Sequence, residues 1–236
     1  MPETAKFLRV RDLNAFYGES HVLHGMSFEV GKAETVALLG RNGAGKTTTL
    51  KSVMGLVEKR TGSIIMRGSE LVDLKPYIIA RLGVTYCPEE RGIFSSLSVG
   101  ENLSLPPAIG AGAASIDDIF ALFPQLRERQ SSQGTKLSGG EQQMLAIGRM
   151  LVTGARLLLI DEPTEGLAPV IVAQIGDILR GLREKGYTLL LVEQNLKFVS
   201  TIADRFLIVE NGRVVDAFDS TSFQTNVAKV EAYLGV

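Results

Sequence analysis

The chain has 236 residues, and its 25 Lys and Arg against 26 Asp and Glu leave a net charge of −1, which gives no general attraction to nucleic acid. This length allows one large α/β domain with a full hydrophobic core, and the single cysteine, Cys87, excludes an internal disulfide. The N-terminal residues lack the apolar core of a signal peptide and no apolar run reaches the length of a membrane span, so we expect an intracellular protein.

The first elements along the chain are predicted strands. Residues 7–16, 22–30 and 63–67 are rich in residues that favour strands, and together they suggest an antiparallel layer. The apolar run 35–39 predicts a further, buried strand, and residues 48–57 are predicted to form a helix. A glycine-rich loop separates that strand from the helix.

This loop is a phosphate-binding motif. Residues 40–47 read Gly-Arg-Asn-Gly-Ala-Gly-Lys-Thr and fit the pattern G-x-x-x-x-G-K-[ST] without a mismatch, between a strand and a helix as the motif requires. Its N–H groups are expected to surround the α- and β-phosphates of a nucleotide, Lys46 to reach the β- and γ-phosphates, and the Thr47 hydroxyl to bind Mg²⁺. An ordinary glycine-rich turn is the alternative, which the complete match disfavours. The residues predicted to bind nucleotide here are Gly40, Arg41, Asn42, Gly43, Ala44, Gly45, Lys46, Thr47 and Thr48.

The rest of the chain alternates strands and helices. Predicted strands end at Cys87, Ile160 and Val192, and the helical stretches between them indicate a parallel central sheet. Residues 91–154 are predicted to form an inserted helical subdomain, with a capping box from Ser98 to Glu101 and a connector at 106–112. Near the C-terminus, Asn-Gly at 211–212 predicts a hairpin between strands at 206–209 and 213–215.

A second anion site is predicted at residues 137–143, Leu-Ser-Gly-Gly-Glu-Gln-Gln. Ser138 and Glu141 form a capping box, which by itself only marks a helix start. Gly139 and Gly140 are unfavourable in a first turn unless another group approaches the backbone closely. Because a helix N-terminus with exposed N–H groups attracts anions, this pair suggests a phosphate partner.

Two carboxylates end the strand at 157–162, Leu-Leu-Leu-Ile-Asp-Glu. The apolar run is typical of a strand that is buried on both faces of a parallel sheet, and ligands bind at the carboxyl ends of such strands. Asp161 is therefore expected to hold Mg²⁺ through its water shell, and Glu162 to polarise the attacking water. A solvated strand end is the alternative for an isolated Asp-Glu pair.

With these motifs the chain resembles the nucleotide-binding subunit of an ABC transporter over nearly its whole length. The resemblance implies a P-loop NTPase fold of the α/β class, with a RecA-like, mostly parallel core sheet, an antiparallel β layer and an inserted helical subdomain. It implies a single nucleotide-binding domain over 1–236, with 1–90 and 155–236 as the catalytic core and 91–154 as the helical subdomain. ATP and Mg²⁺ are the implied cofactors.

The same resemblance implies a site shared between two subunits. Ser138, Gly139, Gly140 and Glu141 correspond to the signature that faces the γ-phosphate bound to a partner's P-loop. Tyr17 corresponds to the aromatic residue that stacks on adenine, although a half-buried strand aromatic is an almost equal reading without the family. Residues 165–168 correspond to the D-loop, which crosses the dimer interface.

Two positions depart from the family pattern. Glu89 stands where the family usually has a glutamine that senses Mg²⁺, so the predicted metal ligands are Thr47, Glu89 and Asp161. Gln194 stands where a histidine usually contacts the γ-phosphate; its amide could donate a hydrogen bond but cannot become cationic. Glu162, Lys46 and Gln194 are thus the predicted catalytic residues.

These departures resemble the ATPase subunits of bacterial branched-chain amino acid importers, although Glu90 replaces a glycine that is usual there. Importers of urea or short amides, and soluble ABC ATPases outside transport, remain alternatives. A P-loop kinase or regulatory protein is disfavoured by the 137–140 motif and by Glu162. The implied partners are a second ATPase subunit, identical or related, membrane permease subunits and, indirectly, an external substrate-binding protein, with no nucleic acid. The implied location is the cytoplasmic face of the cell membrane.

Overall fold

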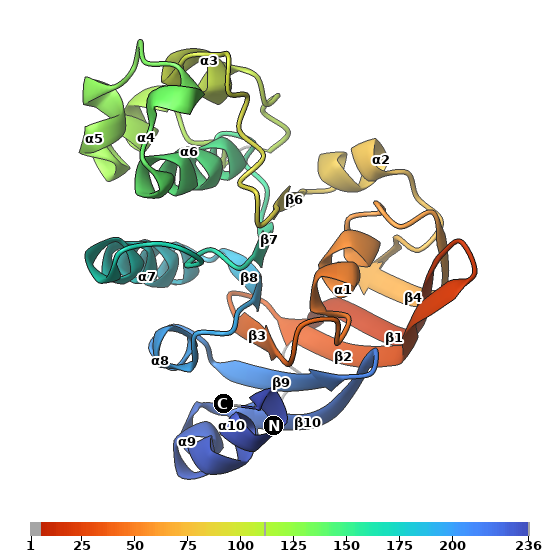
Figure 1. The fold of residues 1–236 in the computed structure, drawn as a ribbon. Helices are drawn as coiled ribbons and strands as arrows, with labels where there is room; N and C mark the ends of the chain where they lie inside the picture. Colours follow the sequence, from red (N-terminus) through yellow and green to blue (C-terminus); the bar gives the residue numbers. More distant parts are fainter. Residues whose placement is uncertain (1–5, 111, 236) are drawn as a thin grey trace.

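The computed structural model describes residues 6–110 and 112–235, and two β-sheets organise them (Figure 1). The first sheet is antiparallel, as the sequence predicted, and its strands lie in the order β2-β1-β4-β5. β4 begins at Lys59 rather than at 63, because the polar residues Lys59 and Arg60 already pair with β1. The strands are β1 (Lys6–Tyr17), β2 (Ser20–Gly31), β4 (Lys59–Met66) and β5 (Ser69–Glu70).

The second sheet lies at the centre, in the order β10-β9-β3-β8-β7-β6. All its neighbouring strands are parallel except β10, which pairs antiparallel with β9. The predicted hairpin joins these two strands, and Asn211 and Gly212 have the positive φ angles of 47° and 71° that a type I′ turn requires. The strands are β3 (Thr35–Leu39), β6 (Val84–Cys87), β7 (Leu157–Asp161), β8 (Thr188–Val192), β9 (Arg205–Glu210) and β10 (Arg213–Asp219).

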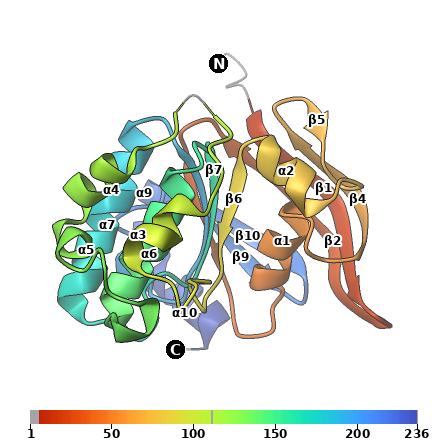
Figure 2. The same ribbon diagram turned by 90° about the horizontal axis from the view of Figure 1, so that it is seen from above.

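Helices cover one face of the central sheet, whereas the antiparallel sheet and two short helices cover the other (Figure 2). The predicted helix at 48–57 is α1, which ends earlier, at Val53, because Gly55 adopts a left-handed φ of 80° just beyond it. The helices are α1 (Lys46–Val53), α2 (Pro76–Arg81), α3 (Val99–Ser104), α4 (Ile116–Leu122), α5 (Pro124–Glu128), the 3-10 turn η1 (Gly134–Lys136), α6 (Gly139–Leu151), α7 (Pro169–Glu184), α8 (Leu196–Val199), α9 (Ser220–Thr225) and α10 (Val227–Leu234).

Four helices, α3 to α6, lie in the segment 91–154 that the sequence singled out, and Figure 1 shows them grouped beyond β6 and β7. Residues 106–110 form neither helix nor strand, as expected of the connector at 106–112, whose residue 111 lies outside the described residues. Residues 1–5, where no signal peptide was expected, also lie outside them. Within the described part of the chain, no helix has the length and apolar character needed to cross a membrane.

Two hydrophobic cores lie on opposite faces of the central sheet, because alternate residues of its strands point to opposite sides. On β7, Leu158 and Ile160 join the core beneath α6 and α7, whereas Leu157 and Leu159 join the core shared with α1 and the antiparallel sheet. Burial on both faces explains why the strand at 157–161 is a continuous apolar run rather than an alternating one. Because β3, β6, β7 and β8 are parallel, their carboxyl ends lie at the same edge of the sheet.

Candidate functional site

A cavity of about 480 Å³ opens at the edge where these strands end. Each of the four loops that follow β3, β6, β7 and β8 contributes polar side chains to it, and the end of β1 forms a further part of its wall. A cavity with several convergent polar groups is the expected form of a small-ligand site. Its lining residues are Tyr17, Val22, Asn42, Gly43, Gly45, Lys46, Thr47, Thr48, Glu89, Glu162, Glu165 and Gln194.

The glycine loop presents Lys46 at the start of α1. Gly45 precedes the helix with a φ of 106°, a conformation that favours glycine, and an added Cβ there would lie 2.8 Å from Leu23 Cδ2. Lys46 is only 5% exposed, and its ammonium donates to the carbonyl oxygens of Gly40 (2.7 Å) and Arg41 (3.1 Å). Burial lowers the pKa of Lys46, and the carboxylates of Glu162 and Asp161 oppose this effect. The loop thus holds a largely desolvated cation at the cavity wall.

Thr47 and Asp161, both predicted metal ligands, are in direct contact. The Thr47 hydroxyl donates to Asp161 Oδ1 at 3.0 Å, and the Tyr86 hydroxyl donates to Asp161 Oδ2 at the same distance. Burial raises the pKa of Asp161, whereas these two hydrogen bonds lower it. Burial and the adjacent Asp161 also raise the pKa of Tyr86, so the phenol stays a donor.

Glu89, the third predicted metal ligand, lines the same cavity. Burial, Glu165 and Glu90 together raise the pKa of Glu89, so this carboxyl group holds a proton more readily than usual. Among the described residues no group of three or more His, Cys, Asp or Glu side chains forms a metal site. A hydroxyl with one or two carboxylates is nevertheless the donor set that suits Mg²⁺ when substrate phosphates supply the remaining ligands.

The predicted catalytic residues Glu162 and Gln194 lie side by side. Gln194 Nε2 donates to Glu162 Oε1 at 2.8 Å and to Asn42 Oδ1 at 2.9 Å, so both of its amide hydrogens are used. A contact from this amide to a phosphate would require it to release one of these partners. Glu162 has a φ of 45°, an uncommon conformation for a side-chain-bearing residue and one that tends to occur at functional sites.

The other residues predicted to bind nucleotide differ in how they relate to the cavity. Tyr17 lies at the cavity wall with 47% of its surface exposed, which leaves its ring accessible to a flat ligand. Gly40 and Arg41 contribute carbonyl oxygens to Lys46, whereas Ala44 is buried in the core shared with β1 and β2. The sequence did not indicate Val22, which also lines the cavity, nor Tyr86; the strand pairing in three dimensions brings both to the site.

The N-terminus of α6, from the capping residue Ser138 to Glu141, contributes no residue to this cavity. The predicted capping box is confirmed: Glu141 N donates to Ser138 Oγ (3.3 Å), and Ser138 N donates to a Glu141 carboxylate oxygen (2.7 Å). The two glycines differ in their surroundings. A Cβ on Gly140 would lie 3.0 Å from Ile171 Cγ2, so packing within the chain accounts for that glycine. A Cβ on Gly139 would meet only ordinary contacts, at 3.4 Å or more, so packing does not explain why residue 139 is a glycine.

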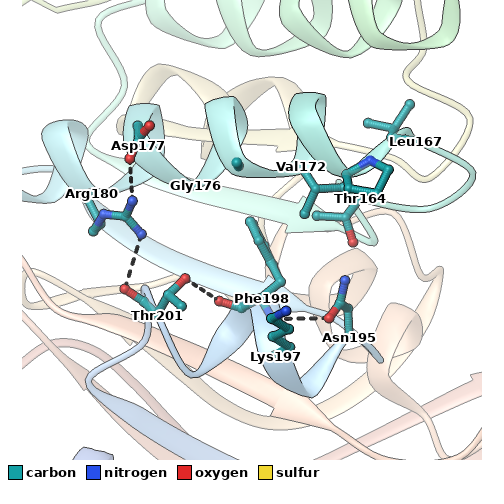
Figure 3. A pocket seen from close by; sticks show the side chains of 12 residues that line it. Thr164, Leu167, Val172, Gly176, Asp177, Arg180, Asn195, Lys197, Phe198 and Thr201 are labelled. Atoms are coloured by element: carbon teal, nitrogen blue, oxygen red, sulfur yellow. Dashed lines mark hydrogen bonds and ion pairs between the residues drawn. The ribbon is translucent and has the colours of Figure 1, made fainter.

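A second cavity, of about 540 Å³, lies between α7 and α8 (Figure 3). Apolar side chains such as Val172 and Phe198 form much of its wall, and Arg180 bonds to Asp177 and to the Thr201 carbonyl at its far end. Its lining contains none of the residues predicted to bind nucleotide or metal, and one of its two cations, Arg180, is already paired with Asp177. The polar cavity around Lys46 is therefore the candidate functional site.

Comparisons with known proteins identify the family of the chain. Residues 23–165 match the family described as ABC transporter. The high-affinity branched-chain amino acid transport ATP-binding protein BraG of Pseudomonas aeruginosa is 44% identical, over 94% of this chain and 97% of BraG. The probable branched-chain amino acid transport ATP-binding protein LivF of Archaeoglobus fulgidus is 37% identical, over 91% of this chain and 92% of LivF.

Two further comparisons concern a relative from an export system and a solved structure. The lipopolysaccharide export system ATP-binding protein LptB of Escherichia coli is 31% identical, over 97% of both chains. A solved structure of an ATP binding subunit of an ABC transporter has a TM-score of 0.82 and 30% identity, and the match covers 98% of this chain and 100% of the other. The likeness extends over the whole fold rather than over the glycine loop alone.

Proposed function

The chain belongs to the ABC transporter family of ATP-hydrolysing subunits, and from this premise we propose that it drives an importer of branched-chain or other hydrophobic amino acids. Similarity to BraG and LivF, whose names specify branched-chain amino acid transport, supports the substrate class. The site itself supports the ATPase step: a buried Lys46, the Thr47–Asp161 pair and the Glu162–Gln194 pair converge on one cavity.

In the proposed reaction, each part of the cavity handles a different part of the nucleotide. Tyr17 stacks on adenine at the cavity wall. The N–H groups of residues 40–48 bind the phosphates, and Lys46 exchanges its two loop carbonyls for oxygens of the β- and γ-phosphates. Because Lys46 is already desolvated, its charge acts strongly on the phosphate charge that develops in the transition state.

The acidic strand end orients the remaining reactants. Glu162 accepts a hydrogen bond from the attacking water and orients it toward the γ-phosphorus atom. Gln194 holds the Glu162 carboxylate and the P-loop side chain of Asn42 together. Thr47, Asp161 and Glu89 would bind Mg²⁺, which when present neutralises charge on the β- and γ-phosphate oxygens.

We propose that the cavity within one chain forms only part of the complete ATP site, and that a second subunit contributes the rest. We infer that Ser138, Gly139, Gly140 and Glu141 complete the γ-phosphate site of a second ATPase subunit, identical or related, which would explain why they lie away from the chain's own cavity. Closure of the two subunits on ATP would then move permease subunits at the cytoplasmic face of the membrane, and a substrate-binding protein outside would act through the permease.

Export of a lipid is the second candidate, because LptB matches this chain over almost its full length. An importer of urea or short amides, or a soluble ABC ATPase, would fit the same site. Purification of the chain in detergent with its associated membrane proteins separates these candidates. We expect permease subunits that, in proteoliposomes with ATP inside, accumulate leucine, isoleucine or valine. Extraction of lipid, uptake of urea alone, or the absence of any membrane partner would contradict the proposal.

A further inference from the structure

Glu193, the last residue before Gln194, is a buried carboxylate to which the proposed mechanism assigns no role. It follows β8 directly and is only 3% exposed. A carboxylate is rarely buried so completely without donors that replace its hydration. Glu193 has four such donors, and their distribution between its two oxygens is specific.

Each oxygen serves a different loop. Oε1 accepts from the Thr164 N–H at 3.0 Å and from the Thr164 hydroxyl at 2.6 Å, on the loop that follows β7. Oε2 accepts from the N–H groups of Gln194 (3.0 Å) and Asn195 (3.1 Å), on the loop that follows β8. Figure 3 shows Thr164 and Asn195 at the same end of the α7–α8 cavity. The carboxylate thus links two loops that are about thirty residues apart in the chain.

Both loops carry a residue of the candidate site. Glu162 lies two residues before Thr164, and Gln194 lies directly after Glu193. The Glu162 N–H donates to the Val192 carbonyl at 2.9 Å, and the two side chains meet at 2.8 Å between Glu162 Oε1 and Gln194 Nε2. Any change in the spacing of the two loops would therefore change the distance between these two side chains.

We propose that Glu193 is a positioning residue for ATP hydrolysis, which clamps the loop at 162–165 to the loop at 193–195 so that Glu162 and Gln194 stay in register. This inference rests on the proposed function. Neither oxygen bonds to any other part of the described chain, so the clamp acts on these two loops alone. Burial is the largest influence and raises the pKa of Glu193 above its usual value, whereas the four hydrogen bonds each lower it.

Only a carboxylate satisfies this arrangement. All four partners donate, so both oxygens must accept. A glutamine has one accepting end and one donating end, so in either orientation its NH₂ group would face the donors of one loop. Glu193→Gln therefore releases one loop while it preserves the size of the side chain. The P-loop contacts to the phosphates are untouched by this change.

The test compares Glu193→Gln with a matched control in the full-length chain. We expect kcat for ATP hydrolysis to fall about 10- to 100-fold, while KM and the ATP dissociation constant stay within about twofold, because misplaced catalytic groups lower the rate without weakening binding. The control is Glu70→Gln. Glu70 accepts from the N–H groups of Ile64, Leu71 and Val72 and from the Ser63 hydroxyl, on the edge strand β5 of the antiparallel sheet, and it does not line the site cavity. It should lower the melting temperature and leave kcat unchanged.

Two further measurements distinguish positioning from a general effect on folding. Thr164→Val removes one donor of the clamp with little change in volume, and it should lower kcat in the same direction but by less. In a Gln194→Ala background, Glu193→Gln should have a smaller effect than in the wild type, because one of the two positioned side chains is already absent. Thr164→Val also serves as the test if Glu193→Gln fails to fold.

A wild-type kcat in Glu193→Gln, or a parallel loss of ATP affinity, would overturn the inference, as would a loss of kcat in Glu70→Gln of the same size. Fully additive effects with Gln194→Ala would also overturn it. Failure of the proposed function has a different outcome: the wild-type chain with its permease subunits would accumulate no branched-chain amino acid, whatever the ATPase rate of Glu193→Gln.

Discussion

Two adjacent carboxylates at the end of β7 have different surroundings and therefore different proposed roles. Asp161 is 1% exposed, and the hydroxyl groups of Thr47 and Tyr86 occupy one oxygen each. Glu162 is half-buried, lines the cavity and bonds through one oxygen to Gln194. We therefore propose that the other oxygen of Glu162 accepts from the attacking water, and that Asp161, together with Thr47, holds the metal ion. The different surroundings of the two residues thus support the different roles that the sequence predicts for them.

Glu162→Gln should bind ATP but hydrolyse it at least about 100-fold more slowly than the wild type, because an amide orients and polarises water poorly. Steady-state ATPase rates measure the loss, and binding of a fluorescent ATP analogue measures the retained affinity. Slow turnover with bound ATP should also accumulate a closed dimer, visible by analytical ultracentrifugation. Unchanged turnover would remove Glu162 from the mechanism.

The glutamine at position 194 affects the expected pH dependence of the ATPase rate. A glutamine does not titrate, so this position should give the ATPase rate no step near the unperturbed histidine pKa of about 6.5. Gln194→His should introduce such a step between pH 5.5 and 8, whereas Gln194→Ala should change the rate without changing the shape of its pH profile. A wild-type step that disappears in Gln194→Ala would contradict the prediction.

At the scale of single elements, two helices begin in the same way and differ in only one respect. α3 is capped by Ser98 and begins with Val99-Gly100-Glu101, α6 is capped by Ser138 and begins with Gly139-Gly140-Glu141, and both capping boxes are formed. The cap accounts for the serine and the glutamate in each case. Packing against Ile171 accounts for Gly140, so Gly139 is the residue that the folding of this chain leaves unexplained.

Gly139→Ala should therefore separate folding from activity. An alanine in a helix is more favourable than a glycine by roughly 0.5–1 kcal/mol, and the site has room for a Cβ, so the melting temperature should stay equal or rise. ATPase activity should nevertheless fall, because the Cβ would stand between the helix N-terminus and the partner's nucleotide.

The matched control is Gly100→Ala, in the first turn of α3. A Cβ there would meet nothing closer than 3.5 Å, so the gain in helix stability should be similar. Its ATPase rate should equal that of the wild type, since α3 has no proposed contact with nucleotide. Equal activity in Gly139→Ala and Gly100→Ala would exclude a role for the glycine pair at a shared site.

At the scale of the whole molecule, the separation of the α6 N-terminus from the chain's own cavity is the main consequence of the fold. The P-loop follows β3 near the middle of the central sheet, whereas α6 lies with α3 to α5 beyond the sheet edge at β6 (Figure 1). A head-to-tail pair of chains would bring one α6 to the other P-loop, and each site would then contain residues of both chains.

Mixing two inactive variants tests this arrangement. Lys46→Ala disables a P-loop and Gly139→Val disables a signature helix, so each variant alone should lose nearly all ATPase activity. In a mixed dimer, the P-loop of the second variant faces the signature helix of the first, and one intact site forms. Equimolar mixing should therefore restore activity, up to about a quarter of the wild-type rate if the chains pair at random and each site acts independently. No recovery, with mixed dimers detected by two affinity tags, would exclude a shared site.

The sequence by itself determined the local features of this protein. The glycine loop at 40–47, the capping box at 138–141, the apolar strand before Asp161 and the hairpin at 211–212 are contiguous, and each depends on the backbone preferences of neighbouring residues. These features sufficed to identify the family and the alternation of strands and helices in the central part of the chain. Two predicted element ends were wrong. β4 begins earlier than predicted because polar residues also pair with β1, and α1 ends earlier than predicted because Gly55 adopts a left-handed conformation just beyond it.

Only the tertiary structure decided which of these features meet. Asn42 and Gln194 are 152 positions apart and come together because β3, β8 and β7 are neighbours in the central sheet, an order that no local pattern encodes. The same strand order brings Tyr86 to Asp161 and Thr164 to Glu193. From the sequence, Glu193 is known only to be an acidic residue. Its burial, its hydrogen-bond donors and the two loops that it joins depend on long-range packing, and the proposed role of Glu193 is based on these features.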